Sequence, residues 1–295
     1  MPELPDIRAY LAALRRGYVG QPLEDFELRS PFLLRSVEPR PDAAKGRVLA
    51  EVARIGKRVV WRFEGGPNFV FHLMVAGRFQ EKKKGARPTR KLDLATFTFA
   101  KGTLLLTEAG TRKRASLHVV AGVNDEAAFD KGGVDVFKAS PSEFAEALSR
   151  ENHTLKRALT DPRLFDGIGG AYSDEILHAA GLSPIRLTQK LTPEEIERLH
   201  EAARDTLQQW SDRLIADAEQ AFPKKVTAFR EGMAVHGRFG EACPNCNTPV
   251  QRIVYASRET NYCPRCQTGG KILADRALSR LLRDDWPKTV DELEK

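Results

Sequence analysis

The segment from Val59 to Leu106 decides the fold of the first half of the chain, because four short apolar runs follow one another in it. These runs are Val59-Val60-Trp61-Arg62-Phe63, Phe69-Val70-Phe71-His72-Leu73, Leu92-Asp93-Leu94-Ala95-Thr96-Phe97-Thr98-Phe99 and Thr103-Leu104-Leu105-Leu106. They are separated by turn residues at Gly65-Gly66-Pro67-Asn68 and Lys101-Gly102. Several short strands at this spacing predict an antiparallel β-sandwich.

Helical patterns flank this segment. Near the N-terminus, apolar residues recur at helical spacing and predict a short amphipathic helix: Ile7, Tyr10, Leu11 and Leu14. After Phe137, two sequences combine an N-cap, a proline and a capping-box glutamate: Ser140-Pro141-Ser142-Glu143 and Thr192-Pro193-Glu194-Glu195. The second predicts a long helix through about Gln220. Another helix is expected from Tyr172 to Ala180, where Gly181 ends it.

The tail from Gly269 to Lys295 contains one more amphipathic stretch. Its apolar face would carry Leu273, Leu278, Leu281 and Leu282. We expect this face to pack back onto the protein rather than to bind a partner helix.

Composition indicates a globular protein of one large or two modest domains. The chain has 295 residues, a hydrophobic fraction of 41% and a formal net charge of +7. No run approaches the roughly 18 consecutive apolar residues of a membrane span. The start, Met1 to Asp6, lacks the basic and apolar regions of a signal peptide. We therefore expect a soluble, cytoplasmic protein.

The positive charge is concentrated between Val52 and Ser116. This segment holds fifteen Lys+Arg and four Asp+Glu. A folded segment of this kind is typical of proteins that bind a polyanion, and nucleic acid is the first candidate. A solvated basic face explains the charge equally well.

All four cysteines lie in one pattern, Cys243-x2-Cys246-x16-Cys263-x2-Cys266. Two such pairs on the arms of a β-hairpin, Ile253-Val254-Tyr255 and Thr260-Asn261-Tyr262, place four thiolates around one zinc ion. Four protein ligands leave no position for water, so the zinc is expected to be structural. Two redox-active pairs are the alternative, although no thioredoxin-like pattern surrounds them.

The N-terminus offers chemistry of its own. Removal of Met1 would give Pro2 a free secondary amine, and an α-amino group is partly neutral at physiological pH. Glu3 places a carboxyl group beside it for general acid or base catalysis. Such an end is more often simply frayed.

Several motifs, taken together in their order along the chain, are specific for one protein family. Pro2-Glu3-Leu4-Pro5-Asp6, Gly56-Lys57, His72-Leu73, the segment from Asp166 to Glu175 and the cysteine hairpin resemble, in order over residues 2 to 267, the formamidopyrimidine-DNA glycosylase and endonuclease VIII family. The resemblance implies an α+β multidomain fold. Its parts would be an N-terminal catalytic β-sandwich domain with flanking helices over residues 1–135, a helix-two-turn-helix DNA-binding domain over 136–225, a zinc finger over 226–267, and a helical extension over 268–295.

The resemblance also implies roles for residues. Pro2 would be the nucleophile, Glu3 the acid and base, and Lys57 a phosphate-binding residue that assists catalysis. Arg258 would grip a phosphate beside an extruded nucleotide, and Met74 or Val75 would fill the gap that the nucleotide leaves. The remaining DNA-binding candidates are Lys156, Gly169, Gly170 and Arg112. The implied function is a monomeric bifunctional DNA glycosylase and abasic-site lyase with one structural zinc.

The chain departs from the family pattern at three places. Gly170 stands where the family usually has an asparagine that contacts phosphate, no Arg-Arg-Phe-Gly motif occurs between Glu108 and Arg114, and the segment from Phe222 to Cys243 is too short for a long lesion-covering loop. The sequence therefore does not determine which damaged base is the substrate. Two other functions remain: a non-catalytic or lyase-only binder of damaged DNA, and a zinc-ribbon protein that binds RNA.

Overall fold

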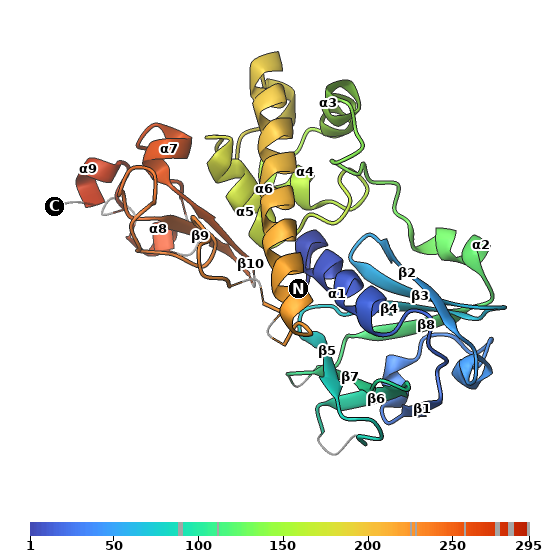
Figure 1. The fold of residues 1–295 in the computed structure, drawn as a ribbon. Coiled ribbons are helices and arrows are strands. Elements are labelled where there is room, and N and C mark those ends of the chain that lie inside the picture. The colour runs from blue at the N-terminus through green and yellow to red at the C-terminus, as the bar shows by residue number, and fades with distance from the viewer. Residues whose placement is uncertain are drawn as a thin grey trace. The chain divides into compact units, whose positions relative to one another are not determined.

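The computed structural model describes residues 1–87, 91–110, 112–224, 226–227, 229–256, 258–274, 278–282 and 286–293 (Figure 1). The chain divides into two compact units, and each is described by itself. The first comprises Met1–Lys131 and Gln209–Thr227, and the second comprises Gly132–Gln208 and Ala228–Lys295. The division into four domains expected from the sequence stays a prediction.

The first unit is an antiparallel β-sandwich, as the strand pattern predicted. One sheet has the order β1-β6-β7-β5 and the other β2-β3-β4-β8. The strands are β1 (Asp25–Leu28), β2 (Leu49–Ile55), β3 (Arg58–Phe63), β4 (Asn68–His72), β5 (Gly77–Lys82), β6 (Asp93–Thr98), β7 (Thr103–Glu108) and β8 (Ser116–Val120). Short 3-10 turns at Pro31–Leu33 and Pro41–Ala44 lie between β1 and β2.

The core of the sandwich is aromatic. Trp61 of β3 lies 5.6 Å from Phe79 of β5 and 5.0 Å from Phe97 of β6, measured between ring centroids, so side chains of the two sheets interleave. Helix α1 (Leu4–Gly17) contacts β2 and β3 and adds Tyr10, whose ring meets Phe79 edge-on at 5.6 Å. This packing holds the start of α1, and with it the N-terminus, against the sandwich.

A short segment covers the outer face of the second sheet. Helix α2 (Val123–Glu126) is followed by a 3-10 turn at Ala127–Phe129. The buried carboxylate of Glu126 pairs with Arg62 at 2.7 Å and accepts a hydrogen bond from Asn68 at 2.8 Å. A charged pair that also receives an amide hydrogen bond fixes this segment on the sheet.

Helices dominate the second unit: α3 (Pro141–Ser149), α4 (Leu155–Thr160), α5 (Gly170–Ala179) and most of α6 (Pro193–Gln220). Both predicted capping boxes are confirmed. Ser140 and Glu143 exchange hydrogen bonds at the start of α3, and Thr192 and Glu195 do so at the start of α6. The predicted helix before Gly181 is α5, and the predicted end of the long helix at Gln220 is confirmed.

The cysteine segment forms the predicted hairpin. Strands β9 (Gln251–Tyr255) and β10 (Arg258–Tyr262) pair antiparallel, and the short helix α7 (Pro264–Thr268) follows. Arg258 pairs with Tyr255, so β10 begins before the expected arm Thr260-Asn261-Tyr262. Ser257 lies outside the described residues. The predicted fold class, sandwich, helical region and four-cysteine hairpin, is confirmed.

The tail differs from its expectation. It contains α8 (Leu278–Leu282) and α9 (Val290–Leu293), and Leu273 precedes both. Leu281 and Leu282 are 77% and 40% exposed, so the prediction that they pack onto the protein is wrong. The packing is made by other residues instead: the backbone of Ile272 and Val290 bonds with Lys288 and Gly270, and the Val290 side chain is buried. The side chain of Leu278 lies outside the described part.

Among the residues that the structure describes, no helix combines the length and apolar character needed to cross a membrane.

Candidate functional site

The N-terminus is held in a buried, charged environment. Pro2 is buried, and the side chains that follow it are nearly inaccessible, with Glu3 3% and Asp6 1% exposed. The backbone N–H of Glu3 donates to the Asp6 carboxylate at 2.9 Å, which closes the first turn of α1. The end of the chain is therefore ordered rather than frayed.

Burial lowers the pKa of the N-terminal amino group, which belongs to Met1 in this structure, below its ordinary value of 8.0. The negative charges of Glu3 and, more weakly, Asp6 raise this pKa. The positive charges of Arg78 and, more weakly, Lys57 lower it further. A lower pKa leaves more of the amine neutral at physiological pH, which is the form that attacks an electrophilic carbon.

Lys57 lies in the tight turn between β2 and β3, where Gly56 adopts a φ of 59°. The side chain is half-buried. Its positive charge acts on the N-terminal amine and on His72, so the turn carries Lys57 to the neighbourhood of both. Pro2 and Glu3 thus lie at a buried N-terminus whose amine is affected by the charge of Lys57, and the catalytic roles of these three residues stay predictions.

The turn between β4 and β5 presents the two candidate gap-filling residues. Val75 is 60% exposed, and Met74 is partly exposed with a left-handed φ of 51°. The turn closes through a hydrogen bond from the Gly77 N–H to the Leu73 carbonyl at 2.8 Å. Arg78 braces it by donating to the Val75 carbonyl at 3.1 Å. Of the two side chains, Val75 is the more accessible.

A row of basic groups on the outer face of the β2-β3-β4-β8 sheet was missed by the sequence reasoning. Arg58 pairs with His72 across β3 and β4, and His118 of β8 lies opposite Val70. The ring of Phe129 lies 4.9 Å from that of His118 and 5.6 Å from the Arg58 guanidinium carbon. Among the described residues, Arg58 Nε and His118 Nδ1 have no hydrogen-bond partner.

The pKa values of His72 and His118 are shifted by burial and by the neighbouring positive charges. Burial, then Arg58, Lys57 and His118, lower the pKa of His72 to about 4. Burial, then Arg58 and Arg35, lower the pKa of His118. The positive charge here thus comes from Arg58, Lys57 and Arg35, while the lowered pKa values keep the two histidines largely uncharged at physiological pH. Strand alternation places these side chains on the outer face, but only the register between strands brings them side by side.

The loop after β7 is fastened by a buried carboxylate. Glu108, 2% exposed, accepts the backbone N–H groups of Arg114 at 2.9 Å and Ala115 at 3.1 Å. Lys113 donates to the carbonyls of Glu108 and Gly110. Arg112 is exposed on this loop, and Thr111 lies outside the described residues.

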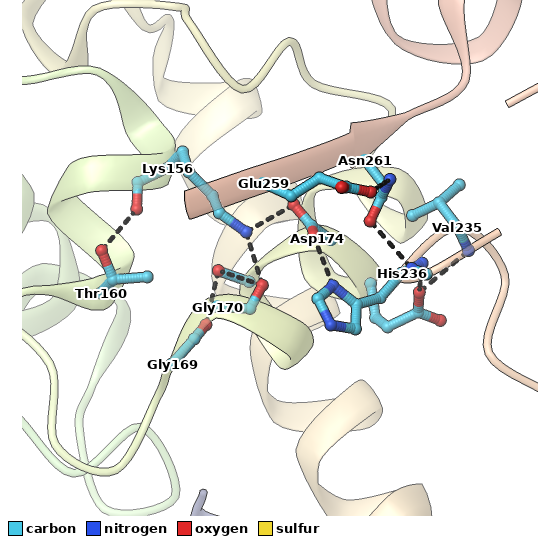
Figure 2. A network of polar contacts seen from close by, with 12 residues as sticks. Lys156, Thr160, Gly169, Gly170, Asp174, Val235, His236, Glu259 and Asn261 are labelled. Carbon is cyan, nitrogen blue, oxygen red and sulfur yellow. Dashed lines mark hydrogen bonds and ion pairs between the residues drawn. The ribbon is translucent and has the colours of Figure 1, made fainter. Parts of the chain in front are cut away.

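In the second unit, three candidate DNA-binding residues meet at the start of α5 (Figure 2). Gly169 precedes the helix and Gly170 is its first residue. The ammonium of Lys156 donates to the Gly170 carbonyl and to Asp174, whose other oxygen lies 2.7 Å from His236 Nδ1. Lys156 thus holds the first turn of α5 through a backbone carbonyl and a buried carboxylate.

The four cysteine sulfurs are placed for one metal ion. All lie within 4.8 Å of one another, and individual pairs are 3.4 to 3.9 Å apart. Zinc bonds of about 2.3 Å in a tetrahedron require sulfurs roughly 3.8 Å apart, so the sulfurs of Cys243, Cys246, Cys263 and Cys266 fit that geometry. Arg258 is exposed at the start of β10, near the tip of the same hairpin.

Comparisons with known proteins agree with this layout. The family model "Formamidopyrimidine-DNA glycosylase N-terminal domain" matches residues 1–116, "Formamidopyrimidine-DNA glycosylase H2TH domain" matches 135–212, and "Zinc finger found in FPG and IleRS" matches 240–269. The predicted structural zinc is confirmed by the last match together with the four convergent cysteines.

Relatives and solved structures extend the similarity over most of the chain. A formamidopyrimidine-DNA glycosylase of Thermus thermophilus is 33% identical over 92% of this chain and 100% of its own. The crystal structure of the MutM (Fpg) protein of T. thermophilus is similar with a TM-score of 0.76 and 31% identity, over 90% of this chain and 98% of that one. A Lactococcus lactis formamidopyrimidine-DNA glycosylase non-covalently bound to DNA containing an abasic site has a TM-score of 0.78 and 25% identity, over 90% and 99%.

Proposed function

Because the chain belongs to the formamidopyrimidine-DNA glycosylase family and is a DNA glycosylase of DNA repair, we propose that it is bifunctional. It removes an oxidised base from duplex DNA and then cleaves the strand at the abasic site. The observation that carries this proposal is the buried N-terminus, where Pro2 and Glu3 are buried and the pKa of the neighbouring Met1 amine is lowered by burial and, more weakly, by Arg78 and Lys57. The L. lactis relative bound to abasic-site DNA supports it.

The reaction begins once Met1 is removed and Pro2 bears the α-amine. The Pro2 nitrogen attacks C1′ of the damaged nucleotide, the electron pair of the glycosidic bond leaves with the base, and the base takes up the proton that the Pro2 nitrogen loses. Glu3 in its acid form then gives a proton to the ring oxygen as the sugar opens to an iminium. The buried position of Glu3 keeps this proton transfer apart from bulk water.

Strand cleavage uses the same iminium. It acidifies the C2′ protons, so loss of one of them expels the 3′ phosphate by β-elimination, and a second elimination expels the 5′ phosphate. Hydrolysis finally returns Pro2 as a free amine. A one-nucleotide gap remains.

Basic groups hold the DNA during these steps. Lys57 and Arg58, whose positive charges both act on His72, bind phosphates near the N-terminus. The exposed Arg258 grips a phosphate at the extruded nucleotide, and Val75 or Met74 fills the gap in the duplex. Arg112 serves the opposite strand. Because the substrate DNA lies in the nucleoid, we expect the enzyme to act in the cytoplasm of a bacterial-type cell.

A lyase-only or non-catalytic binder of damaged DNA is the second candidate. Gly170 favours it, since the first residue of α5 lacks a side chain with which to contact phosphate. The N-terminal amine and Glu3 favour the bifunctional enzyme. A lesion panel scored separately for base release and strand cleavage distinguishes the two.

Borohydride trapping tests the proposed nucleophile. Intact-mass measurement should show a protein that begins at Pro2, and reduction in the presence of abasic-site DNA should link the two covalently, because only an iminium is reduced to a stable amine. The matched control is the same protein acetylated at its N-terminus, which should give no adduct. Trapping by the acetylated protein, or none by the free one, would overturn the role of Pro2.

A further inference from the structure

A histidine outside the cysteine segment touches the zinc site. His178 lies in α5 and is 5% exposed. Its Nε2 atom lies 3.2 Å from the sulfur of Cys243, which is fully buried. The zinc-finger match begins at residue 240, so this contact comes from the helical region and not from the finger itself.

We propose that His178 donates an N–H···S hydrogen bond to the zinc-bound thiolate of Cys243, and thereby slows zinc release and ties α5 to the zinc finger. His178 acts here as a positioning residue for the metal site. The inference rests on the zinc site alone and is independent of the proposed reaction.

Charge explains why such a donor is needed. Four thiolates around Zn²⁺ carry a net charge of −2, and a buried charge is costly unless hydrogen bonds compensate it. Cys246 and Cys266 are partly exposed, so water reaches them, whereas Cys243 and Cys263 are buried. For Cys263 the backbone N–H of Cys266 points to the sulfur at 3.5 Å. His178 provides the corresponding donor to Cys243.

The same helix is fixed to the finger region at two further points. One turn before His178, the Glu175 carboxylate accepts the backbone N–H groups of Ala234, Val235 and His236 at 2.6 to 2.9 Å. After α5, the Leu182 carbonyl accepts a hydrogen bond from Gln267 at 2.9 Å. Only the His178 contact ends on a metal ligand. It is therefore the contact through which zinc occupancy acts directly on α5.

Substitution of His178 separates this role from simple packing. His178→Phe retains a ring of similar size but removes the N–H donor, while His178→Gln retains an N–H donor. The matched control is His200→Phe, which replaces another buried histidine of the second unit that packs on Phe144 at 4.8 Å between ring centroids. All proteins are prepared with zinc and compared by circular dichroism before measurement.

Two measurements are made on each protein. With excess chelator and a colorimetric zinc indicator, His178→Phe should release zinc about tenfold faster than the unchanged protein, since partners of metal ligands are worth about 10- to 100-fold in metal affinity. His178→Gln should lie between them, and His200→Phe should match the unchanged protein. In Co²⁺-substituted protein, the thiolate-to-cobalt absorption should move to lower energy in His178→Phe.

The cobalt spectrum distinguishes loss of the hydrogen bond from a general loss of packing, even if a variant is less stable. A general loss of packing speeds zinc release without rescue by His178→Gln and leaves the absorption of the cobalt-loaded protein unchanged. That result would overturn the proposal, as would release within twofold of the unchanged protein.

Discussion

At the scale of single residues, charge environments distinguish chemically similar side chains. His72 and His236 are both largely covered histidines, yet His72 faces Arg58, Lys57 and His118, while His236 contacts the Asp174 carboxylate at 2.7 Å. Burial and like charge disfavour the protonated form of His72.

The lowered pKa of His72 predicts a loss of stability in acid. The unfolded state takes up a proton near pH 6.5 and the folded state only near pH 4, so this contribution to stability is complete above pH 6.5 and falls as the pH decreases towards 4. Between pH 7.5 and pH 5 the loss should be about 2 kcal/mol. Urea unfolding at both pH values measures it.

His72→Gln is the control for this prediction. It removes the titrating group, so its stability should fall about 2 kcal/mol less over the same pH interval. Equal pH dependence of the two proteins would mean that His72 titrates normally in the folded state.

Arg258→Ala should weaken DNA binding irrespective of sequence. If its exposed guanidinium holds one phosphate, the slope of log affinity against log salt should fall by about one contact. Zinc should be retained and cleavage of a preformed abasic site should continue slowly, because Pro2 and Glu3 are unchanged. Release of an intact base should suffer more, since it depends on holding the extruded nucleotide.

Arg163→Ala is the matched control for Arg258→Ala. It removes the same charge from an arginine that already pairs with Asp161 and Glu151. Binding isotherms at several salt concentrations compare the two. Equal salt slopes and equal base release in both variants would assign Arg258 to the solvated surface.

At the scale of elements, helix α5 begins without a side-chain cap and has a glycine, Gly170, as its first residue. Gly169 makes no side-chain cap, and a Cβ built on Gly170 meets no atom within 4 Å. Lys156 and Asp174 hold the first turn from one side. The helix end therefore has room for a side chain that would contact an anion at its N–H groups.

Gly170→Asn should raise affinity for abasic-site DNA several-fold, because the amide adds a donor to the phosphate at the helix N-terminus. Gly170→Ala is the control, since it adds a Cβ without the amide and should leave affinity nearly unchanged. Thermal unfolding should show both variants at least as stable as the unchanged chain. Equal affinity in all three proteins would place the phosphate elsewhere.

At the scale of the whole molecule, two units with separate sources of stability share the long helix α6. The first unit has a large aromatic core around Trp61, whereas the finger of the second has a small cluster in which cysteines are themselves members. Such a small core depends on its metal. Loss of zinc is therefore expected to affect the two units unequally.

Cys263→Ser, or removal of zinc by a chelator, should unfold the hairpin and weaken DNA binding, because metal affinity is folding energy in such a site. The near-ultraviolet circular dichroism of the aromatic sandwich core should persist. Zinc content, DNA affinity and the spectrum are measured on the same samples. Unchanged DNA affinity in metal-free protein would contradict this prediction.

Local features of this chain were predictable from its sequence. The capping boxes at Ser140 and Thr192, the helix end before Gly181 and the strand alternation in Val59 to Leu106 depend on neighbouring residues, and the structure agrees with each. The metal site was also predictable from the spacing of the cysteines, because the two cysteines of each pair lie within one turn.

Other features depended on contacts between distant parts of the chain. The register of β3, β4 and β8 decides that Arg58, His72 and His118 form one row, α1 packing decides that the N-terminus meets Lys57, and α5 decides that His178 reaches Cys243. In the tail, Val290 bonds to the Gly270 carbonyl and is buried, whereas Leu281 is exposed against its amphipathic pattern. Periodicity specifies which face of an element is apolar, but the partner of that face is selected by the free energy of the whole packed chain.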